Sequence, residues 1–299
     1  LKTYDVIIIG GSYAGLSAAM ALGRSLKSVL IIDSGLPCNR QTPHSHNFIT
    51  QDGVRPAAIS EKAKGQVLKY DTVKFLGGVA SAGMKTESGF TVRAREGEEF
   101  IAEKLIFASG IKDIMPDIKG FSDCWGISVI HCPYCHGYEY RGQRTAVIAN
   151  GEKAFHLASL ISNLTSDITI LTAGKAGFND GQTSALKRRG ISIIENEISE
   201  IEHENGRVKN IVFRGIDKMK FDAVYAAVQF KQHSDIPVSL GCELTETGHL
   251  KIDSSQQTTV EGVYACGDNS SALRTVANAV YSGNLAGSMV NRKLTEERF

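Results

Sequence analysis

A pair of cysteines two residues apart is the sharpest chemical signal in this sequence. Cys132 and Cys135 stand in the run His-Cys-Pro-Tyr-Cys-His-Gly (131–137), and His136 follows them directly. Cysteines at this spacing can close a small disulfide ring, and at a helix start the dipole and a nearby imidazolium lower a thiol pKa toward neutrality. An imidazole, with an unperturbed pKa of about 6.5, can act there as base or acid. The run therefore predicts a centre for thiol–disulfide exchange.

Other uses of this run compete with exchange. Cys-x-x-Cys-His is also the attachment pattern of c-type haem, but that chemistry belongs to exported proteins and no export signal is visible. A zinc site needs a second pair of ligands, whereas the remaining cysteines are isolated and are expected to be structural: Cys38, Cys124, Cys242 and Cys266. Inert core cysteines, and a His136 that only caps or packs, stay open as alternatives.

A second signal is a glycine-rich turn near the start of the chain. An apolar strand over residues 4–9 runs into Gly10-x-Ser12-x-x-Gly15 and a helix, which together present backbone N–H groups to a pyrophosphate. Gly10 permits the turn, Gly15 permits close packing, and Ser12 replaces the middle glycine of the usual fingerprint. Asp33, eighteen residues after Gly15, is placed to accept a hydrogen bond from a ribose hydroxyl. Plain βαβ packing is the alternative to dinucleotide binding.

These groups are positioned by a pattern that occurs twice. In the first copy the turn and a helix to about residue 26 lead to a strand at 29–33. In the second copy a strand at 145–148 precedes the turn 149–154, a helix to about residue 164 and a strand at 168–171. Strands that are apolar throughout are expected when helices cover both faces of a parallel sheet. The duplication predicts an α/β fold of two doubly wound, Rossmann-like nucleotide-binding domains.

Further elements are predicted between and after the two copies. They are a helix over 56–70, a hairpin-like stretch over 90–102, a buried strand over 105–108 ended by Ser109-Gly110, a hairpin over 198–213 with its turn at 204–206, a buried strand over 223–228, a strand near 263–265 and a final helix over 275–292. The late strand resembles those of the first domain, so we expect the chain to return there. A boundary is expected in the linker 116–120.

The composition is that of a soluble globular protein. The 299 residues carry a formal net charge of +1, with 22% charged and 42% hydrophobic residues. This balance does not favour a nucleic acid or a membrane surface as the main partner. Apolar runs such as 6–9 are too short to cross a bilayer, and no signal peptide precedes the first strand. We therefore expect a cytoplasmic protein.

The whole chain resembles the low-molecular-weight thioredoxin reductase family of FAD-dependent disulfide oxidoreductases. The resemblance rests on Asp-Val-Ile-Ile-Ile-Gly-Gly (5–11), Ala-Ser-Gly (108–110), the cysteine pair and Gly-Val-Tyr-Ala-Cys-Gly-Asp (262–268), in that order. It implies a discontinuous FAD domain, residues 1–116 and 243–299. Into it is inserted a pyridine-nucleotide-like domain, residues 117–242, that carries the cysteine pair. It also implies a homodimer.

The same resemblance implies roles for individual residues. Cys135 would face flavin C4a, and Cys132 would attack the partner disulfide. Asp268 would hold the ribityl or phosphate region, and the N-terminus of the last helix would lie at the flavin O2 and N1, where it can stabilise the reduced anion. The remaining cofactor-binding positions that we expect are Gly110, Gly267, Thr275 and Val276.

Departures from the family pattern shape the functional hypothesis. His136 stands where thioredoxin reductases carry an acid, and Ala149 replaces the first glycine of the second nucleotide turn. Only Lys175 is basic within 171–177, where the family holds the 2′-phosphate with several arginines, and the residues at 228–232 are bulky. Losing two or three such phosphate contacts, each worth about 1.5–3 kcal/mol, would lower affinity on the order of 10³-fold or more. Binding of NADPH or NADH is therefore doubtful.

These departures make the chain similar to the dithiol oxidase branch of the family, which oxidises a small-molecule dithiol and passes electrons through FAD to oxygen. The imidazoles of His44 and His46 can sit near flavin or substrate, or can be solvated loop residues. Our hypothesis is an FAD-dependent thiol/disulfide oxidoreductase that needs no tightly bound NADPH and acts on a small dithiol or a thioredoxin-like protein. An NADPH-dependent thioredoxin reductase and a flavin redox sensor without turnover are the alternatives.

Overall fold

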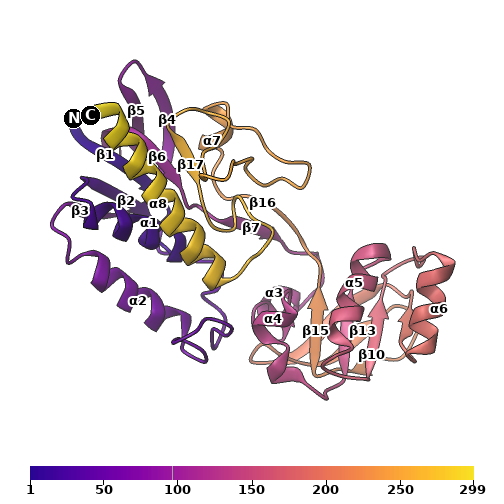
Figure 1. Ribbon diagram of the computed structural model, residues 1–299. Helices are drawn as coiled ribbons and strands as arrows, with labels where there is room; N and C mark the ends of the chain where they lie inside the picture. The colour runs from indigo at the N-terminus through magenta and orange to yellow at the C-terminus, as the bar shows by residue number, and fades with distance from the viewer. Residues whose placement is uncertain (96) are drawn as a thin grey trace. The chain divides into compact units, whose positions relative to one another are not determined.

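The computed structural model describes residues 1–95 and 97–299 and divides them into two compact units (Figure 1). Unit 1 comprises Leu1–Arg40, Asn47–Lys112 and Phe230–Phe299, and unit 2 comprises Gln41–His46 and Asp113–Gln229. The second unit is therefore inserted into the sequence of the first, as the sequence predicts. A short piece of the early chain, Gln41–His46, also belongs to unit 2, which the sequence does not reveal.

The units change at residues other than the expected boundaries 116/117 and 242/243. The chain enters unit 2 at Asp113 and returns to unit 1 at Phe230. Ile236 and Cys242 are buried in the same core cluster as Ile7 of the first strand, so this stretch packs with unit 1. The few apolar residues of 230–242 are spread through a polar sequence. The periodicity of the sequence therefore did not place the unit boundary at Phe230.

Unit 1 is built on a seven-stranded sheet in the order β3-β2-β1-β6-β5-β4, with β17 also paired to β6. The strands are β1 (Lys2–Ile9), β2 (Val29–Asp33), β3 (Val73–Gly77), β4 (Ala80–Thr86), β5 (Gly89–Ala94), β6 (Glu99–Phe107) and β17 (Val263–Ala265). The expected hairpin and the buried strand at 105–108 overlap in one continuous strand, β6. Its first half pairs antiparallel with β5 and its last residues pair parallel with β17. The late strand thus returns to the first sheet, as expected.

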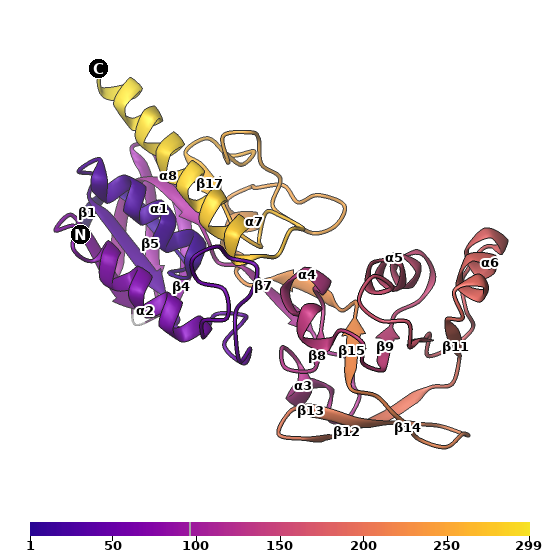
Figure 2. The ribbon, with the colours of Figure 1, turned by 60° about the horizontal axis from the view of Figure 1, so that its bottom comes forward.

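Helices cover one face of this sheet (Figure 1). They are α1 (Tyr13–Arg24), α2 (Pro56–Val67) and α8 (Val276–Arg298), while the short α7 (Ile236–Ser239) packs by Ile236 on the opposite face. Both views show α8 beside α1 (Figures 1 and 2). A Cβ added to Gly283 would lie 2.1 Å from the Ala14 carbonyl oxygen, and one added to Gly287 would lie 2.5 Å from that of Ala18. The two glycines therefore permit the close approach of these helices.

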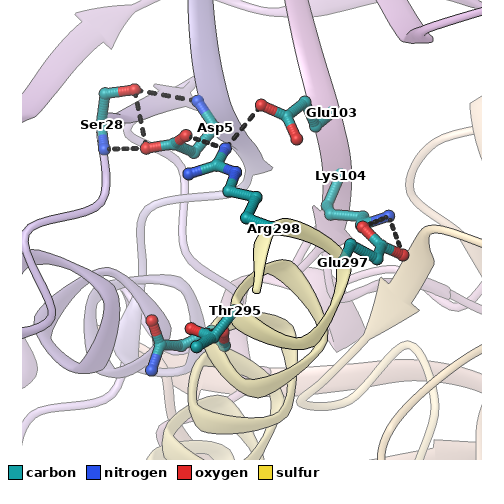
Figure 3. Close-up of polar contacts among 8 residues, drawn as sticks. Asp5, Ser28, Glu103, Lys104, Thr295, Glu297 and Arg298 are labelled. Carbon is teal, nitrogen blue, oxygen red and sulfur yellow. Dashed lines mark hydrogen bonds and ion pairs between the residues drawn. The ribbon is translucent and has the colours of Figure 1, made fainter.

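The last helix extends beyond residue 292, where the sequence pattern placed its end. Figure 3 shows the contacts of its final turn: Arg298 pairs with Asp5 and Glu103, and Lys104 Nζ lies 2.7 Å from a carboxylate oxygen of Glu297. Lys104 is nearly buried, so its ion pair is less exposed to solvent than an ordinary surface pair. These ionic contacts to β1 and β6 explain why the helix continues to Arg298.

Unit 2 contains a five-stranded parallel sheet in the order β11-β10-β9-β15-β8 and a three-stranded antiparallel sheet, β12-β13-β14. The strands are β8 (Val129–Ile130), β9 (Thr145–Ile148), β10 (Ile168–Leu171), β11 (Ser192–Ile194), β12 (Ile198–Glu204), β13 (Arg207–Phe213), β14 (Met219–Lys220) and β15 (Ala223–Ala226). In Figure 2 the parallel strands lie between helices α5 (Gly151–Ile161) and α6 (Asp180–Arg188) on one side and the antiparallel sheet on the other. The predicted βαβ repeat and the β12–β13 hairpin are confirmed.

Several short elements escaped the sequence patterns. They are α3 (Phe121–Cys124), the 3₁₀ turn Tyr138–Tyr140, and the pair β7 (Ile111–Ile114) and β16 (Gln229–Gln232), which form a small sheet of their own. The helix start expected at the cysteine pair is the single-turn helix α4 (Pro133–His136). Helix α6 was also missed, although Asn179 and Gln182 form a capping box at its start. Among the described helices, none combines the length and the apolar character needed to cross a membrane.

Candidate active site

The turn between β1 and α1 is shaped to receive a phosphate group. A Cβ at Gly10 would lie 2.2 Å from the Ala108 carbonyl oxygen, and one at Gly15 would lie 1.9 Å from the carbonyl oxygen of Gly10, so both positions exclude a side chain. Within the described residues the Ser12 side chain caps no backbone N–H, and the first turn of α1 holds no acid. The helix N-terminus is therefore open to an anion.

Asp33 holds this turn in place. One of its carboxylate oxygens accepts a hydrogen bond from the Gly11 N–H at 2.8 Å, and the other accepts from the Gly35 N–H at 2.9 Å. A carboxylate has about four acceptor sites, so these bonds leave capacity for a ribose hydroxyl. The structural role of Asp33 was not foreseen, and its ribose role stays a prediction.

Asp268 lies in a polar cluster at the end of β17. A carboxylate oxygen of Asp268 is 3.7 Å from Arg274 Nε and 3.9 Å from Cys38 Sγ. Cys38 is exposed, whereas the other three cysteines outside the pair are buried. Burial raises the pKa of Cys124 to about 11 and that of Cys266 to about 12, which keeps both thiols protonated.

Two buried side chains of unit 1 each have a polar atom without a hydrogen-bond partner among the described residues. The sequence did not single out either residue. Asn269 donates to the Phe107 carbonyl at 2.8 Å, but its side-chain oxygen has no hydrogen-bond partner among the described residues. His249 packs on Phe230 and bonds Thr247 through Nδ1, while Nε2 is buried and likewise unpartnered there. Buried polar atoms of this kind are normally satisfied by a ligand or by water. Asn269 could have been found from the sequence, because it is the polar residue directly after Gly267-Asp268.

The other expected cofactor positions also lie in unit 1. Gly110 has a φ of +64°, a backbone conformation that favours glycine, and Gly267 has a φ of +82°. Thr275 caps α8 by accepting from the Asn278 N–H at 3.1 Å, and Val276 is the first residue of that helix. The open turn at α1, these two glycines and the orphaned atom of Asn269 fit a bound dinucleotide.

The cysteine pair is in unit 2 and is oxidised. Cys132 and Cys135 form a disulfide, and Cys132 Sγ accepts a hydrogen bond from the Cys135 N–H at 3.1 Å. The helix that starts here, α4, has only four residues. A helix dipole was expected to activate the thiol, but a single turn supplies only a small part of that effect. The neighbouring imidazole therefore becomes the more important group.

Three imidazoles form a chain that begins at His136, the residue after Cys135. The ring of His46 meets that of His136 edge-on at 6.5 Å between centroids, and His44 lies 6.4 Å from His46. His46 Nε2 is 3.6 Å from a carboxylate oxygen of Glu139. Burial, and then the charge of His46, lower the pKa of His136, while Glu139 opposes them. His136 is thus neutral at pH 7 and able to accept a proton.

A pocket of about 410 Å³ opens onto this cluster. Its lining includes Pro43, His44, His46, Ile127, His136, Glu139, Tyr140, Arg207, Lys209, Lys220 and Asp222. All of these residues belong to unit 2, because Gln41–His46 packs there. The volume lies in the range of small-molecule sites.

The second nucleotide turn, between β9 and α5, is closed by the chain itself. The side-chain oxygen of Asn150 accepts from the Gly151 N–H at 2.7 Å and from the Gly177 N–H at 2.8 Å, and its amide donates to the Lys175 carbonyl at 2.9 Å. The Ala176 N–H also donates to Glu195 at 2.6 Å. The loop after β10 is therefore bound to the N-terminus of α5, where a pyrophosphate would lie in an open Rossmann turn.

Lys153 in the first turn of α5 and Lys175 in the loop after β10 are the basic residues of these two segments. Lys175 is exposed, and its backbone carbonyl is committed to Asn150. The first turn of α5 carries Glu152, which accepts from the Gln182 side chain at 2.6 Å. Phe230, a bulky residue expected where the nucleotide would need room, is in β16 and packs on His249 in unit 1.

Comparison with known proteins bears on this arrangement. The family model described as "pyridine nucleotide-disulphide oxidoreductase" matches residues 4–283. The chain belongs to this family. This family member is an FAD-dependent disulfide oxidoreductase, and it resembles thioredoxin reductases.

Individual relatives match this family member over nearly its whole length. It is 34% identical to the thioredoxin reductase tcpT of Claviceps purpurea (97% of this chain, 94% of that protein) and 32% identical to the thioredoxin reductase sirT of Leptosphaeria maculans (96% and 93%). Among solved structures, an oxidoreductase from Agrobacterium tumefaciens superposes with a TM-score of 0.92 at 35% identity, covering 99% of each chain. The predicted fold class is thereby confirmed.

Proposed function

We propose that this chain is a dithiol oxidase. It oxidises a small-molecule dithiol at Cys132 and Cys135 and passes the electrons through FAD to oxygen or another acceptor, without tight binding of NADPH or NADH. The observation that carries the proposal is the closed turn at α5, where Asn150 bonds the N–H groups of Gly151 and Gly177. A nucleotide pyrophosphate would have to displace these bonds and the loop that they hold.

The contrast between the two turns supports this assignment. At α1 the N-terminus is uncapped within the described residues, and small residues clear the approach. At α5 the same position is filled by the chain. We therefore assign FAD to unit 1 and its expected site residues Gly10, Ser12, Gly15, Asp33 and Asp268. Unit 2 keeps the nucleotide-binding fold and serves to carry the disulfide.

The protein's own residues account for the exchange steps. His136 accepts a proton from a substrate thiol, and the thiolate attacks Cys132 Sγ. The Cys132–Cys135 bond breaks, Cys135 leaves as a thiolate, and a mixed disulfide forms. The second substrate thiol then loses its proton and attacks the substrate sulfur of that mixed disulfide, so that cyclic disulfide and the Cys132 thiolate are released. Bound FAD supplies the two-electron acceptor that restores the protein disulfide.

The neutral imidazole of His136 supports electron flow from the substrate dithiol to the protein disulfide. An acid at position 136 would serve to protonate a leaving thiolate, whereas His136 with its lowered pKa is a base at neutral pH. His46 and Glu139 stand next to it to take the proton onward. A homodimer remains part of the proposal by resemblance, and a cytoplasmic location remains an expectation from the sequence.

The second candidate is an NADPH-dependent thioredoxin reductase acting on a thioredoxin-like protein, favoured by the names of the fungal relatives. A redox sensor without turnover is the third. Anaerobic stopped-flow reduction of the holoenzyme separates the three. A dithiol should bleach the flavin absorbance readily, and NADPH and NADH should do so slowly and about equally. Fast, saturable bleaching by micromolar NADPH would establish the reductase, and reduction by dithiol without turnover in oxygen would establish the sensor.

A further inference from the structure

Oxidation of a dithiol requires His136 to release protons as well as to accept them. In the exchange steps above both substrate thiols are deprotonated, and Cys132 and Cys135 are both left as thiolates. Two electrons and one proton go to bound FAD, so one proton for each dithiol has to reach the solvent. A neutral imidazole accepts only one extra proton. His136 must therefore lose the first proton before it can accept the second.

The pocket of about 410 Å³ lies next to this base and not at the sulfur atoms. Among the described residues it is lined by His136 but by neither cysteine of the pair. A dithiol that filled the pocket would therefore not be in contact with the disulfide. The volume has room for on the order of ten water molecules at about 30 Å³ each. The pocket is thus placed to serve the imidazole.

The charges around the pocket offset one another. Of its three cations, Lys209 already pairs with Glu204 at 3.3 Å. The remaining charged lining residues are two acids and two cations, Glu139, Asp222, Arg207 and Lys220. All three cations are exposed, so this side of the pocket meets the solvent. A polar cavity without surplus charge selects no ion and is suited to water.

A second imidazole connects His136 with the exposed part of the pocket. The rings of His46 and His136 meet edge-on at 6.5 Å between centroids. Their nearest nitrogens are then about 4 Å apart or more, which is too far for a direct hydrogen bond and is spanned by one bridging water. His46 Nε2 lies 3.6 Å from a carboxylate oxygen of Glu139, and these two side chains are 20% and 38% exposed. The path from His136 through His46 to Glu139 thus leads toward the solvent.

The other titratable groups of the lining do not interrupt this path. The Tyr140 hydroxyl donates to the Ile127 carbonyl at 2.6 Å, and burial raises the pKa of Tyr140, so it stays protonated. His44 is exposed and lies 6.4 Å from His46, where it extends the chain of imidazoles.

We propose that this pocket is the outlet for the proton that His136 removes from the substrate, and that His46 relays this proton to water in the pocket. The proposal rests on the function proposed above and assigns the pocket to the proton rather than to the dithiol. Protonated His136 gives its proton through a bridging water to one ring nitrogen of His46, and the other nitrogen of His46 releases a proton to pocket water beside Glu139. No electrons move, and His136 is neutral again for the second thiol. His46 acts through His136 and is a positioning residue.

Proton release can be followed directly in the holoenzyme. Anaerobic stopped-flow mixing with dithiothreitol, in dilute buffer with a pH-indicator dye, records flavin bleaching and proton release together. The two should coincide in the unaltered protein. In His46→Gln both should slow about tenfold, and free imidazole should restore the rate to within about twofold. His156→Gln is the control, because this exposed imidazole of α5 does not line the pocket, and the rate should be unchanged.

Polymer-bound imidazole tests the pocket itself. Poly(vinylimidazole) carries the same base but is too large to enter a pocket of about 410 Å³. Rescue of His46→Gln by free imidazole and not by the polymer supports the outlet. Equal rescue by both would overturn the pocket as the route. A slow His46→Gln that neither base restores would mean a structural defect and would overturn the relay.

A reverse measurement separates this inference from the function on which it rests. If dithiothreitol fails to reduce the flavin, the oxidase is overturned, and the relay is tested as proton uptake when photoreduced holoenzyme reduces lipoamide. Slower uptake in His46→Gln that free imidazole restores would still support the outlet. Rapid oxidation of dithiothreitol that is unchanged in His46→Gln would overturn the relay and leave the oxidase standing.

Discussion

The side-chain oxygen of Asn150 lies 2.8 Å from the backbone nitrogen of Gly177, so the loop after β10 is bound to the N-terminus of α5. The same oxygen accepts from Gly151. One side chain thus caps a helix and holds a loop over it. Asn150, the second residue after β9, thus stands at the helix N-terminus where a nucleotide phosphate lies in an open Rossmann turn.

Replacement of Asn150 by alanine should free this loop. The Gly151 and Gly177 amides lose their acceptor, so their hydrogen exchange should become faster, and the free energy of unfolding should fall by about 1 kcal/mol, as for loss of a helix cap. Asn179→Ala is the matched control, because Asn179 caps α6 in the same unit. It should cost similar stability and leave exchange at Gly177 unchanged. Unaltered exchange at Gly177 in Asn150→Ala would show that the bond does not hold the loop.

The two cysteines should differ in role. If Cys135 faces the flavin, Cys132→Ser should leave a thiolate that gives a long-wavelength charge-transfer band with bound FAD. Cys135→Ser should abolish the band and leave Cys132 open to alkylation, measured by mass spectrometry after iodoacetamide. Cys124→Ser is the control, since that thiol is buried and its pKa is about 11. A band in Cys135→Ser but not in Cys132→Ser would reverse the roles.

The pH dependence of the exchange step should report His136. Only the neutral imidazole accepts a proton, and burial lowers the pKa of His136. The rate should therefore fall only when the pH drops below the usual pKa range of histidine. The sequence alone had suggested that this fall occurs near neutral pH. His46→Ala removes a charge that lowers this pKa, and the acid limb should then move to higher pH. His136→Ala should slow flavin reduction by dithiol about 10²-fold and remove the limb. An unchanged rate would reduce His136 to a packing residue.

Flavin retention should depend on Asp268. Asp268→Ala removes a half-buried carboxylate and leaves Arg274 without that partner, so the dissociation constant of FAD should rise about tenfold, or about 1.4 kcal/mol. Titration of the apoprotein by calorimetry measures this. Asp71→Ala, at an exposed position of the same unit, is the control. Equal FAD affinity in both variants would remove Asp268 from the cofactor site.

The close packing of α1 against α8 should leave no room for a methyl group at Gly283. Alanine is favoured over glycine in a helix by about 1 kcal/mol. At Gly283, however, the added Cβ would lie 2.1 Å from the Ala14 carbonyl oxygen, so Gly283→Ala should lower the free energy of unfolding by about 1–3 kcal/mol. Gly65→Ala in α2 is the matched control, because nothing lies within 4 Å of its Cβ, and it should be neutral or stabilising in urea unfolding. Equal effects would contradict the close crossing.

The sequence alone determined the features that rest on local pattern. Apolar strands, a glycine turn and an amphipathic helix are read within about thirty residues, so the repeated βαβ units could be predicted, whereas the insertion of one domain into the other was implied by the family resemblance. The Cys132–Cys135 disulfide is likewise local, because two cysteines at this spacing can close a small ring. The hairpin turn at 204–206 followed for the same reason, since the turn type selects its residues.

The tertiary structure alone decided where distant segments meet. Gln41–His46 belongs in sequence to the first half of the chain yet packs in unit 2, where His46 meets His136. No local pattern records such a contact, because it depends on how loops and sheets are packed together. The same holds for the bond between Asn150 and Gly177, which lie on different loops, and for the unsatisfied atom of Asn269. The residue types were visible in the sequence, but their neighbours were set by long-range packing.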